Sequence, residues 1–474
     1  MSFLTRDIRK GIIDAGLILI ILFSPLAFGS VHIWAYTLVE LIVFCLLILW
    51  AARKVLSPHD MDDVGGTREL TPVYISFIIF FSFVLLQIIP VPPQVIRFFS
   101  PRAFDLYSMA IPGYEKDALW RGLSIYPHAS TIALIKYAAY AGVFFLVTQD
   151  IRERKRINRL VMAMICAGSF EAIYGLYGYF SKNYSIFGFS RIHMPGPATG
   201  TYVNRNHFAG YLGMIVFVGI GYLLSTMPMK IRQDRGWRHR LVSLFNSAKT
   251  PERGLVLIMI ITMILGIIFS LSRMGVFSFV VSLLLMIFLA LVNRQRRMVS
   301  IIFIIFALGL SASLWYGLDP LIDRYHHTAE SYINRAVVWE STRRLIEDYP
   351  VTGSGLGTYE SIFQRYKPRD FSHHLLIYDH AHNDYLEILS EVGIIGILPL
   401  LFGGIYFLML LFKKWIKSEN GLSTQISLGG IGAMLYILLH SLTDFNMHIP
   451  ANAMTLCIIM GLSYNNLLKD ECRM

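Results

Sequence analysis

Charged residues are scarce in this chain of 474 residues. Only 15% are Asp, Glu, Lys or Arg, whereas 55% are hydrophobic and the mean hydropathy is +0.54. A soluble globular domain carries roughly 25% charged residues, so the composition excludes a water-soluble enzyme and fits a protein that lies mostly in lipid. No polar stretch is long enough to form a separate soluble domain. We therefore expect residues 1–474 to form a single membrane domain.

Patterns that bind metals are also missing. The chain has four cysteines, which are Cys45, Cys166, Cys457 and Cys472. None lies in a predicted outer loop, so no disulfide is expected, and no CxxC or Cys/His spacing indicates a structural zinc site. A zinc site made of His380, His382 and Asp384 is a weaker hypothesis, because ligands two residues apart do not share a helix face. We expect neither a metal nor a cofactor.

Apolar stretches of about 20 residues, the length that crosses a bilayer as a helix, recur along the whole chain. Twelve are predicted, at residues 12–30, 32–52, 71–90, 130–149, 159–180, 207–226, 254–272, 274–292, 299–317, 393–412, 424–441 and 451–468. The expected fold class is an all-α polytopic membrane protein with both termini in the cytoplasm. The short segments on that side hold 26 of the 42 lysines and arginines, as the positive-inside rule requires. The net charge of +11 therefore reports topology and contact with membrane lipids, and we expect no nucleic-acid partner.

Two predicted outer loops are long, at residues 91–129 and 318–392. In the larger loop, residues 331–349 read as a helix that ends before Pro350, and a glycine-rich turn follows at 353–357. A second helix is predicted to begin near His382 and to continue into the span at 393–412. We expect this large helical loop to carry part of any functional site.

The densest group of polar residues lies at 380–393. Residues three or four apart share a helix face, so His382 is predicted beside Tyr385, with Asn383 and Glu387 on the neighbouring face. An imidazole in this position can act as a general base that a carboxylate or an amide orients. A solvated helix start explains the same residues equally well, and both interpretations stay open on the residues alone.

Two arginines stand in unusual positions. Arg273 separates two predicted spans, where a charged side chain is costly and normally has a partner. Its guanidinium group could bind a diphosphate with two parallel hydrogen bonds. Arg335 lies one helical turn before Trp339, whose ring could stack on the arginine or on a sugar. The alternatives are an arginine that reaches the lipid headgroups and an amphipathic helix that lies on the membrane surface.

Further polar residues fall on the same predicted side of the membrane. Arg205 and Asn206 could supply hydrogen-bond donors at a helix start, although helix capping explains Asn206 equally well. A patch at 440–450 interrupts two apolar stretches. Because the orientation was set by lysine and arginine counts alone, the gathering of these groups on one side favours an active site on the non-cytoplasmic face.

These motifs together resemble the O-antigen ligase and O-antigen polymerase superfamily. The matching stretches are residues 204–212, 270–275, 335–357, 382–393 and 440–453. The resemblance implies a metal-independent membrane glycosyltransferase of the bacterial inner membrane, with its active site facing the periplasm. The implied donor is a glycan carried on undecaprenyl diphosphate.

The resemblance also implies roles for individual residues. Arg273 and Arg335 match arginines that would hold the diphosphate, and His382 matches the histidine that would deprotonate the acceptor hydroxyl. His380 is a second candidate for the base. The residues predicted to contact substrate are Trp339, Asn383, Arg205, Asn206, Glu387 and Arg343.

Several acceptors fit the same chemistry. In a ligase the acceptor is lipid A-core of lipopolysaccharide, and this is the interpretation that we favour. In an O-antigen or exopolysaccharide polymerase the acceptor is a second lipid-linked glycan. A protein O-oligosaccharyltransferase ranks lower. A non-enzymatic flippase or exporter also ranks lower, because a transport path would place charged residues along the spans.

Overall fold

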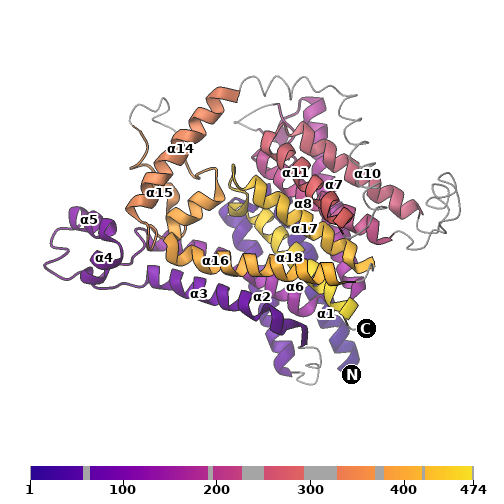
Figure 1. The fold of residues 1–474 in the computed structure, drawn as a ribbon, viewed down its shortest axis with the longest axis horizontal. Coiled ribbons are helices and arrows are strands. Elements are labelled where there is room, and N and C mark those ends of the chain that lie inside the picture. The colour runs from indigo at the N-terminus through magenta and orange to yellow at the C-terminus, as the bar shows by residue number, and fades with distance from the viewer. Residues whose placement is uncertain are drawn as a thin grey trace.

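The computed structural model describes residues 2–56, 65–190, 196–226, 250–292, 328–368, 378–418 and 422–471. Within these residues, eight helices are long and apolar enough to cross a membrane. The long helices lie side by side in one bundle, with α4, α5, α14 and α15 set to one side of it (Figure 1). The expected all-α, multi-pass membrane protein is thus confirmed. Two strands of two residues each, β1 (Ser185–Ile186) and β2 (Phe189–Ser190), pair as an antiparallel hairpin.

Helices occupy eleven of the twelve predicted spans. They are α1 (Ser2–Leu26), α2 (Ile33–Leu56), α3 (Thr71–Ile88), α6 (Pro127–Asp150), α7 (Arg154–Ser181), α8 (Arg205–Thr226), α10 (Thr250–Phe269), α11 (Arg273–Val292), α16 (Asp384–Lys417), α17 (Leu422–His440) and α18 (Pro450–Glu471). The predicted span at 299–317 and Cys472 lie outside the described residues. The total of twelve spans therefore stays a prediction.

Helix α8 forms the centre of the bundle, and its apolar segment is entirely buried. It packs closely on α17 because glycines allow the two backbones to approach. A Cβ atom on Gly221 would lie 2.6 Å from the carbonyl oxygen of Gln425. Nearer the other end of α8, the Tyr436 hydroxyl donates a hydrogen bond to the Ala209 carbonyl oxygen at 2.8 Å. These contacts fix the start of α8, where Arg205 and Asn206 stand.

Charged side chains at one end of the bundle pair with one another. Arg156, only 5% exposed, lies 2.6 Å from Asp14 and 2.5 Å from Asp150. Lys414 pairs with Glu69 at 2.8 Å. The basic residues at the predicted cytoplasmic end thus join α7 to α1 and α6, and α16 to the turn that precedes α3. The opposite end gathers the starts of α8, α11 and α16 and the end of α17.

The large loop contains α14 (Thr328–Asp348) and α15 (Tyr359–Phe363), and α14 confirms the helix predicted at 331–349. The glycine-rich turn between them pairs with the first part of α16, where Gly355 N donates to the Glu391 carbonyl at 2.9 Å. Gly353 has φ +69°, and a Cβ atom there would lie 2.2 Å from the Glu391 backbone. Only glycine permits this approach. The turn therefore fixes the position of the start of α16. The helix bends at Gly393, where φ is +58°.

The shorter outer loop packs against the same region. It forms α4 (Pro93–Phe99) and α5 (Pro101–Ala110). Ile96 and Tyr107 from these helices share a hydrophobic cluster with Val338 and Leu345 of α14. This cluster therefore links the shorter outer loop to α14.

Candidate functional site

The turn before α16 places His382 differently from the sequence-based prediction. The helix begins at Asp384, and Asn383 caps it by accepting hydrogen bonds from the backbone N–H groups of Tyr385 at 3.0 Å and Leu386 at 3.1 Å. His382 precedes this cap with φ +50°, a conformation that costs energy for a residue other than glycine. The prediction that His382 shares a helix face with Tyr385 is therefore wrong. The Asn383 side chain caps the N-terminus of the helix, so the helix begins after the histidine.

Asp444, in the segment between α17 and η4 (Asn446–His448), stands at the centre of the polar motifs. Its side chain is 1% exposed. The Oδ1 atom lies 3.4 Å from His207 Nε2 and 3.7 Å from His382 Nδ1. The Oδ2 atom lies 3.9 Å from Arg335 Nη2 and accepts a hydrogen bond from the Asn206 amide. One carboxylate thus contacts residues from three other segments, which are α8, α14 and the turn before α16.

The surroundings of Asp444 keep it ionised. Burial alone would raise the pKa of this carboxyl group, but the neighbouring His207 and His382 outweigh burial and hold the pKa well below its ordinary value. A buried carboxylate is stable only where positive or hydrogen-bonding groups compensate it.

Sequence reasoning did not select Asp444. The patch at 440–450 was noted as an interruption between two apolar stretches, and none of its residues was named as a site candidate. The available signal was an aspartate flanked by His440 and His448 between two membrane-spanning segments, since ionisable residues at such places usually serve a function.

A small pocket, open to solvent, lies beside Asp444 and brings three predicted arginines together. It is lined by Arg205, Asn206, Leu271, Arg273, Met274, Arg335 and Asp444. Arg205 begins α8 and Arg273 begins α11, so the positive ends of two helix dipoles also meet here. Three guanidinium groups against one carboxylate give this arginine cavity the charge of an anion-binding site.

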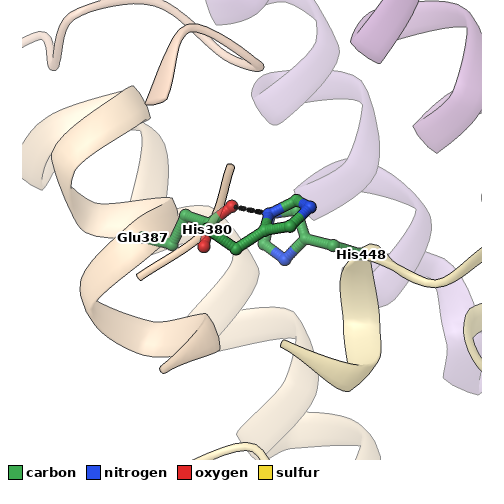
Figure 2. A group of neighbouring side chains, drawn as sticks. All are labelled: His380, Glu387 and His448. Carbon is green, nitrogen blue, oxygen red and sulfur yellow. Dashed lines mark hydrogen bonds and ion pairs between the residues drawn. The ribbon is translucent and has the colours of Figure 1, made fainter. Parts of the chain in front are cut away.

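A second cluster is formed by His380, Glu387 and His448 (Figure 2). His380 Nδ1 lies 2.6 Å from Glu387 Oε1, and the Ala381 N–H donates to Glu387 Oε2 at 2.7 Å. His448 Nδ1 lies 2.7 Å from Asp384 Oδ1, and its Nε2 atom lies 3.3 Å from Glu387 Oε1. Burial opposes protonation of His448, but Glu387 and the hydrogen bond to Asp384 outweigh it and raise the pKa of this histidine to about 9.

The same cluster is where a metal ion would find ligands among the described residues. The ligand atoms of His380, Glu387 and His448 lie within 4.8 Å of one another, a different set from the His380, His382 and Asp384 considered from the sequence. A protonated histidine has no free lone pair for a metal. The carboxylate of Glu387 already accepts hydrogen bonds from His380 and from the Ala381 N–H. Hydrogen bonding and ion pairing account for every contact in the cluster.

The remaining predicted substrate contacts lie outside the arginine cavity. The Trp339 indole donates to the Ala381 carbonyl oxygen at 3.1 Å, and the Asn383 amide donates to the Leu442 carbonyl oxygen at 2.9 Å. Both side chains therefore hold the segment that carries His382. Arg343 does not line the cavity and forms exposed ion pairs with Glu340 and Glu347.

Residues 258–401 match the family model described as O-antigen ligase. The matched stretch includes Arg273, Arg335 and His382, and it ends before Asp444. No curated protein matches the chain.

Proposed function

We propose a reaction for this chain from the premise that it belongs to the O-antigen ligase and polymerase superfamily. The protein transfers a glycan from undecaprenyl diphosphate to an acceptor hydroxyl at the periplasmic face of the bacterial inner membrane. The observation that carries this proposal is the meeting of Arg205, Arg273 and Arg335 around one cavity, with His382 beside the carboxylate that borders it.

The charge and the hydrogen-bond donors of the arginine cavity suit a diphosphate leaving group. When the bond between the anomeric carbon and the diphosphate breaks, negative charge develops on the departing oxygen. Guanidinium groups fixed in place beforehand stabilise that charge without reorganisation, and their paired N–H donors match the geometry of phosphate oxygens. Arg273 and Arg335 hold the diphosphate in this scheme, and Arg205 with Asn206 adds donors at the start of α8.

His382 is the general base. A sugar hydroxyl is a weak nucleophile and needs a base within hydrogen-bond reach. The hydroxyl oxygen attacks the anomeric carbon, its proton passes to His382, and undecaprenyl diphosphate departs with the bonding electrons. Asp444 orients the imidazole and stabilises the imidazolium that forms. This single displacement inverts the anomeric centre, and the arginines supply the positive charge that a metal ion would otherwise provide.

The acceptor that we favour is lipid A-core, which makes the protein an O-antigen ligase. A polymerase must bind a second lipid diphosphate and would need further basic residues near the cavity. The basic residues available for that task are Arg205, Arg343, Arg344 and Arg365. Arg343 and Arg344 are engaged in ion pairs with Glu340, whereas Arg205 lines the arginine cavity. The O-antigen or exopolysaccharide polymerase remains the second candidate, because it needs the same arginines and the same base.

Deletion of the gene, followed by gel analysis of glycans, tests the choice of acceptor. For a ligase, lipid A-core should lose its long glycan cap while long polymer accumulates on the lipid carrier. Accumulation of single repeats, with core carrying at most one, would identify a polymerase. Intact lipopolysaccharide with loss of glycan from exported proteins would identify a protein O-oligosaccharyltransferase.

A further inference from the structure

Glu171 places a carboxyl group inside the bundle, in the part of α7 that is predicted to cross the membrane. The residue is fully buried, and α7 packs against α1, α8 and α10 (Figure 1). Among the described residues, its carboxyl group contacts no positively charged side chain, and its hydrogen bonds are made with Thr201. A buried carboxylate without a compensating charge is costly, and such a group normally becomes neutral.

The contacts of the Thr201 hydroxyl group bear on the charge of Glu171. The Thr201 Oγ1 atom lies 2.7 Å from the carbonyl oxygen of Pro25 and 2.7 Å from Glu171 Oε1. A hydroxyl group has one hydrogen to donate, and a backbone carbonyl oxygen can only accept. The Thr201 hydrogen therefore points to Pro25, in the last turn of α1. The hydrogen between Oγ1 and Oε1 then has to come from Glu171, which requires a protonated carboxyl group.

The other oxygen of the same carboxyl group supports the backbone of the loop at 198–202. Glu171 Oε2 accepts a hydrogen bond from the Thr201 N–H group at 2.8 Å. Gly200 has φ +56°, and a Cβ atom there would lie 2.3 Å from Oε2, so only glycine allows the backbone to come this close. One neutral acid thus holds the loop through a donor, an acceptor and direct packing.

This loop lies between the segments that carry two arginines of the arginine cavity. Thr201 stands four residues before Arg205. On the other side, the Ala198 N–H group donates to the carbonyl oxygen of Phe269 at 2.9 Å, four residues before Arg273. Ala198 and Thr201 are at most 1% exposed. Because the loop is bonded on both sides, its position affects the distance between the two arginines.

We propose that Glu171 is protonated and that this neutral acid is a positioning residue for the arginine cavity. By holding the loop at 198–202, it fixes Arg205 relative to Arg273, so that both guanidinium groups reach the same donor diphosphate. The positioning role rests on the glycosyl transfer proposed above, whereas the protonation of Glu171 follows from the hydrogen bonds of Thr201 alone.

Difference infrared spectroscopy tests the proton directly. The spectrum of the wild type minus that of Glu171→Gln, both purified in detergent at pH 7, should contain the carbonyl stretch of a protonated carboxylic acid. Glutamine preserves the surroundings, because its amide oxygen accepts from the Thr201 N–H group and its amide nitrogen donates to the Thr201 hydroxyl. The bands of an ionised carboxylate in the difference spectrum would overturn the protonated state.

Transfer kinetics test the positioning role, with the host's undecaprenyl-diphosphate-linked glycan as donor and its lipid A-core as acceptor. Glu171→Gln should match the wild type in kcat and in both KM values. Glu171→Ala loses both bonds to Thr201 and should raise the donor KM about 10-fold or more, the loss of one hydrogen bond to a charged group. Its acceptor KM should stay at the wild-type value. A smaller folded fraction would lower the rate without changing either KM.

Glu40→Ala is the matched control. Glu40 is also a buried glutamate in a membrane-spanning helix, α2, and it does not line the arginine cavity, so its donor KM should equal that of the wild type. A second pair of variants removes less of the side chain. Thr201→Val keeps the shape of threonine without its hydroxyl and should raise the donor KM, whereas Thr201→Ser keeps the hydroxyl and should not.

The outcomes separate this inference from the proposed function. A wild-type donor KM in both Glu171→Ala and Thr201→Val, with normal transfer by the wild type, refutes the positioning role and leaves the proposed function standing. The infrared band of a protonated Glu171 in a wild-type protein that transfers no glycan would overturn the proposed function and retain the protonated acid.

Discussion

His382 Nδ1 lies 3.7 Å from Asp444 Oδ1, although the two residues belong to different loops. Two hydrogen bonds bring the loops together. The Asp384 N–H donates to the Ser441 carbonyl oxygen at 3.0 Å, and the Asn383 amide donates to the Leu442 carbonyl oxygen at 2.9 Å. The start of α16 is thereby tied to the segment after α17, and the imidazole is presented to a buried carboxylate.

Asp444→Asn should lower kcat by roughly 10- to 150-fold, because a hydrogen bond to a charged group contributes about 1.5–3 kcal/mol. Asparagine keeps the size of the side chain and removes the charge that orients His382 and compensates Arg335. Transfer by the purified protein measures the effect, and Asp105→Asn, at an exposed position on α5, is the control. Activity equal to that of the wild type would show that Asp444 has no part in the reaction.

His382→Ala should abolish transfer while the protein still inserts into the membrane, because the acceptor hydroxyl loses its base. His380→Ala should be milder, since His380 pairs with Glu387, whereas His382 faces Asp444 beside the arginine cavity. The two variants are compared in the same transfer assay. Near-normal activity of His382→Ala together with loss of activity in His380→Ala would reverse the assignment of the base.

The stability of the protein should fall as the pH rises from about 6.5 to about 9. His448 has a folded-state pKa of about 9, above the value of about 6.5 for an unfolded chain. Its contribution is therefore complete below pH 6.5 and is lost as the pH rises through 9. Glu387, Asp384 and Glu391 of α16 supply the negative charge that holds this proton.

Thermal unfolding in detergent at pH 6 and pH 10 measures this effect. His448→Gln should melt at a lower temperature than the wild type at pH 6 and should depend less on pH. The same dependence on pH in both proteins would mean that another group is responsible.

Transfer activity should survive EDTA. In the proposed reaction the arginines take the role of a divalent ion. Among the described residues, the groups closest to a metal-ligand arrangement are His380, Glu387 and His448, which contact one another. Activity that disappears with the chelator and returns with magnesium or manganese would contradict this expectation.

Local sequence patterns predicted the helices and singled out the arginines as site candidates. The length of an apolar stretch, and an isolated charge within one, can be read directly from the sequence. The position of His382 could not be read in this way, since helix periodicity does not show that the Asn383 side chain ends the helix first. Asp444 was missed because its partners come from distant segments. The pairing of Arg343 with Glu340 and Glu347 was readable from spacings of three and four residues, and it argued against a substrate contact.

The central claim is that the arginine cavity stabilises the departing diphosphate. The most direct test is the turnover of purified Arg273→Ala and Arg335→Ala in transfer from undecaprenyl-diphosphate-linked glycan to lipid A-core, with Arg97→Ala, an exposed arginine, as the control. Each cavity variant should lose about 100- to 1,000-fold in kcat, and lysine at either position should restore little, because a point charge lacks the paired donors. Turnover within a few-fold of the wild type in both alanine variants would contradict the claim.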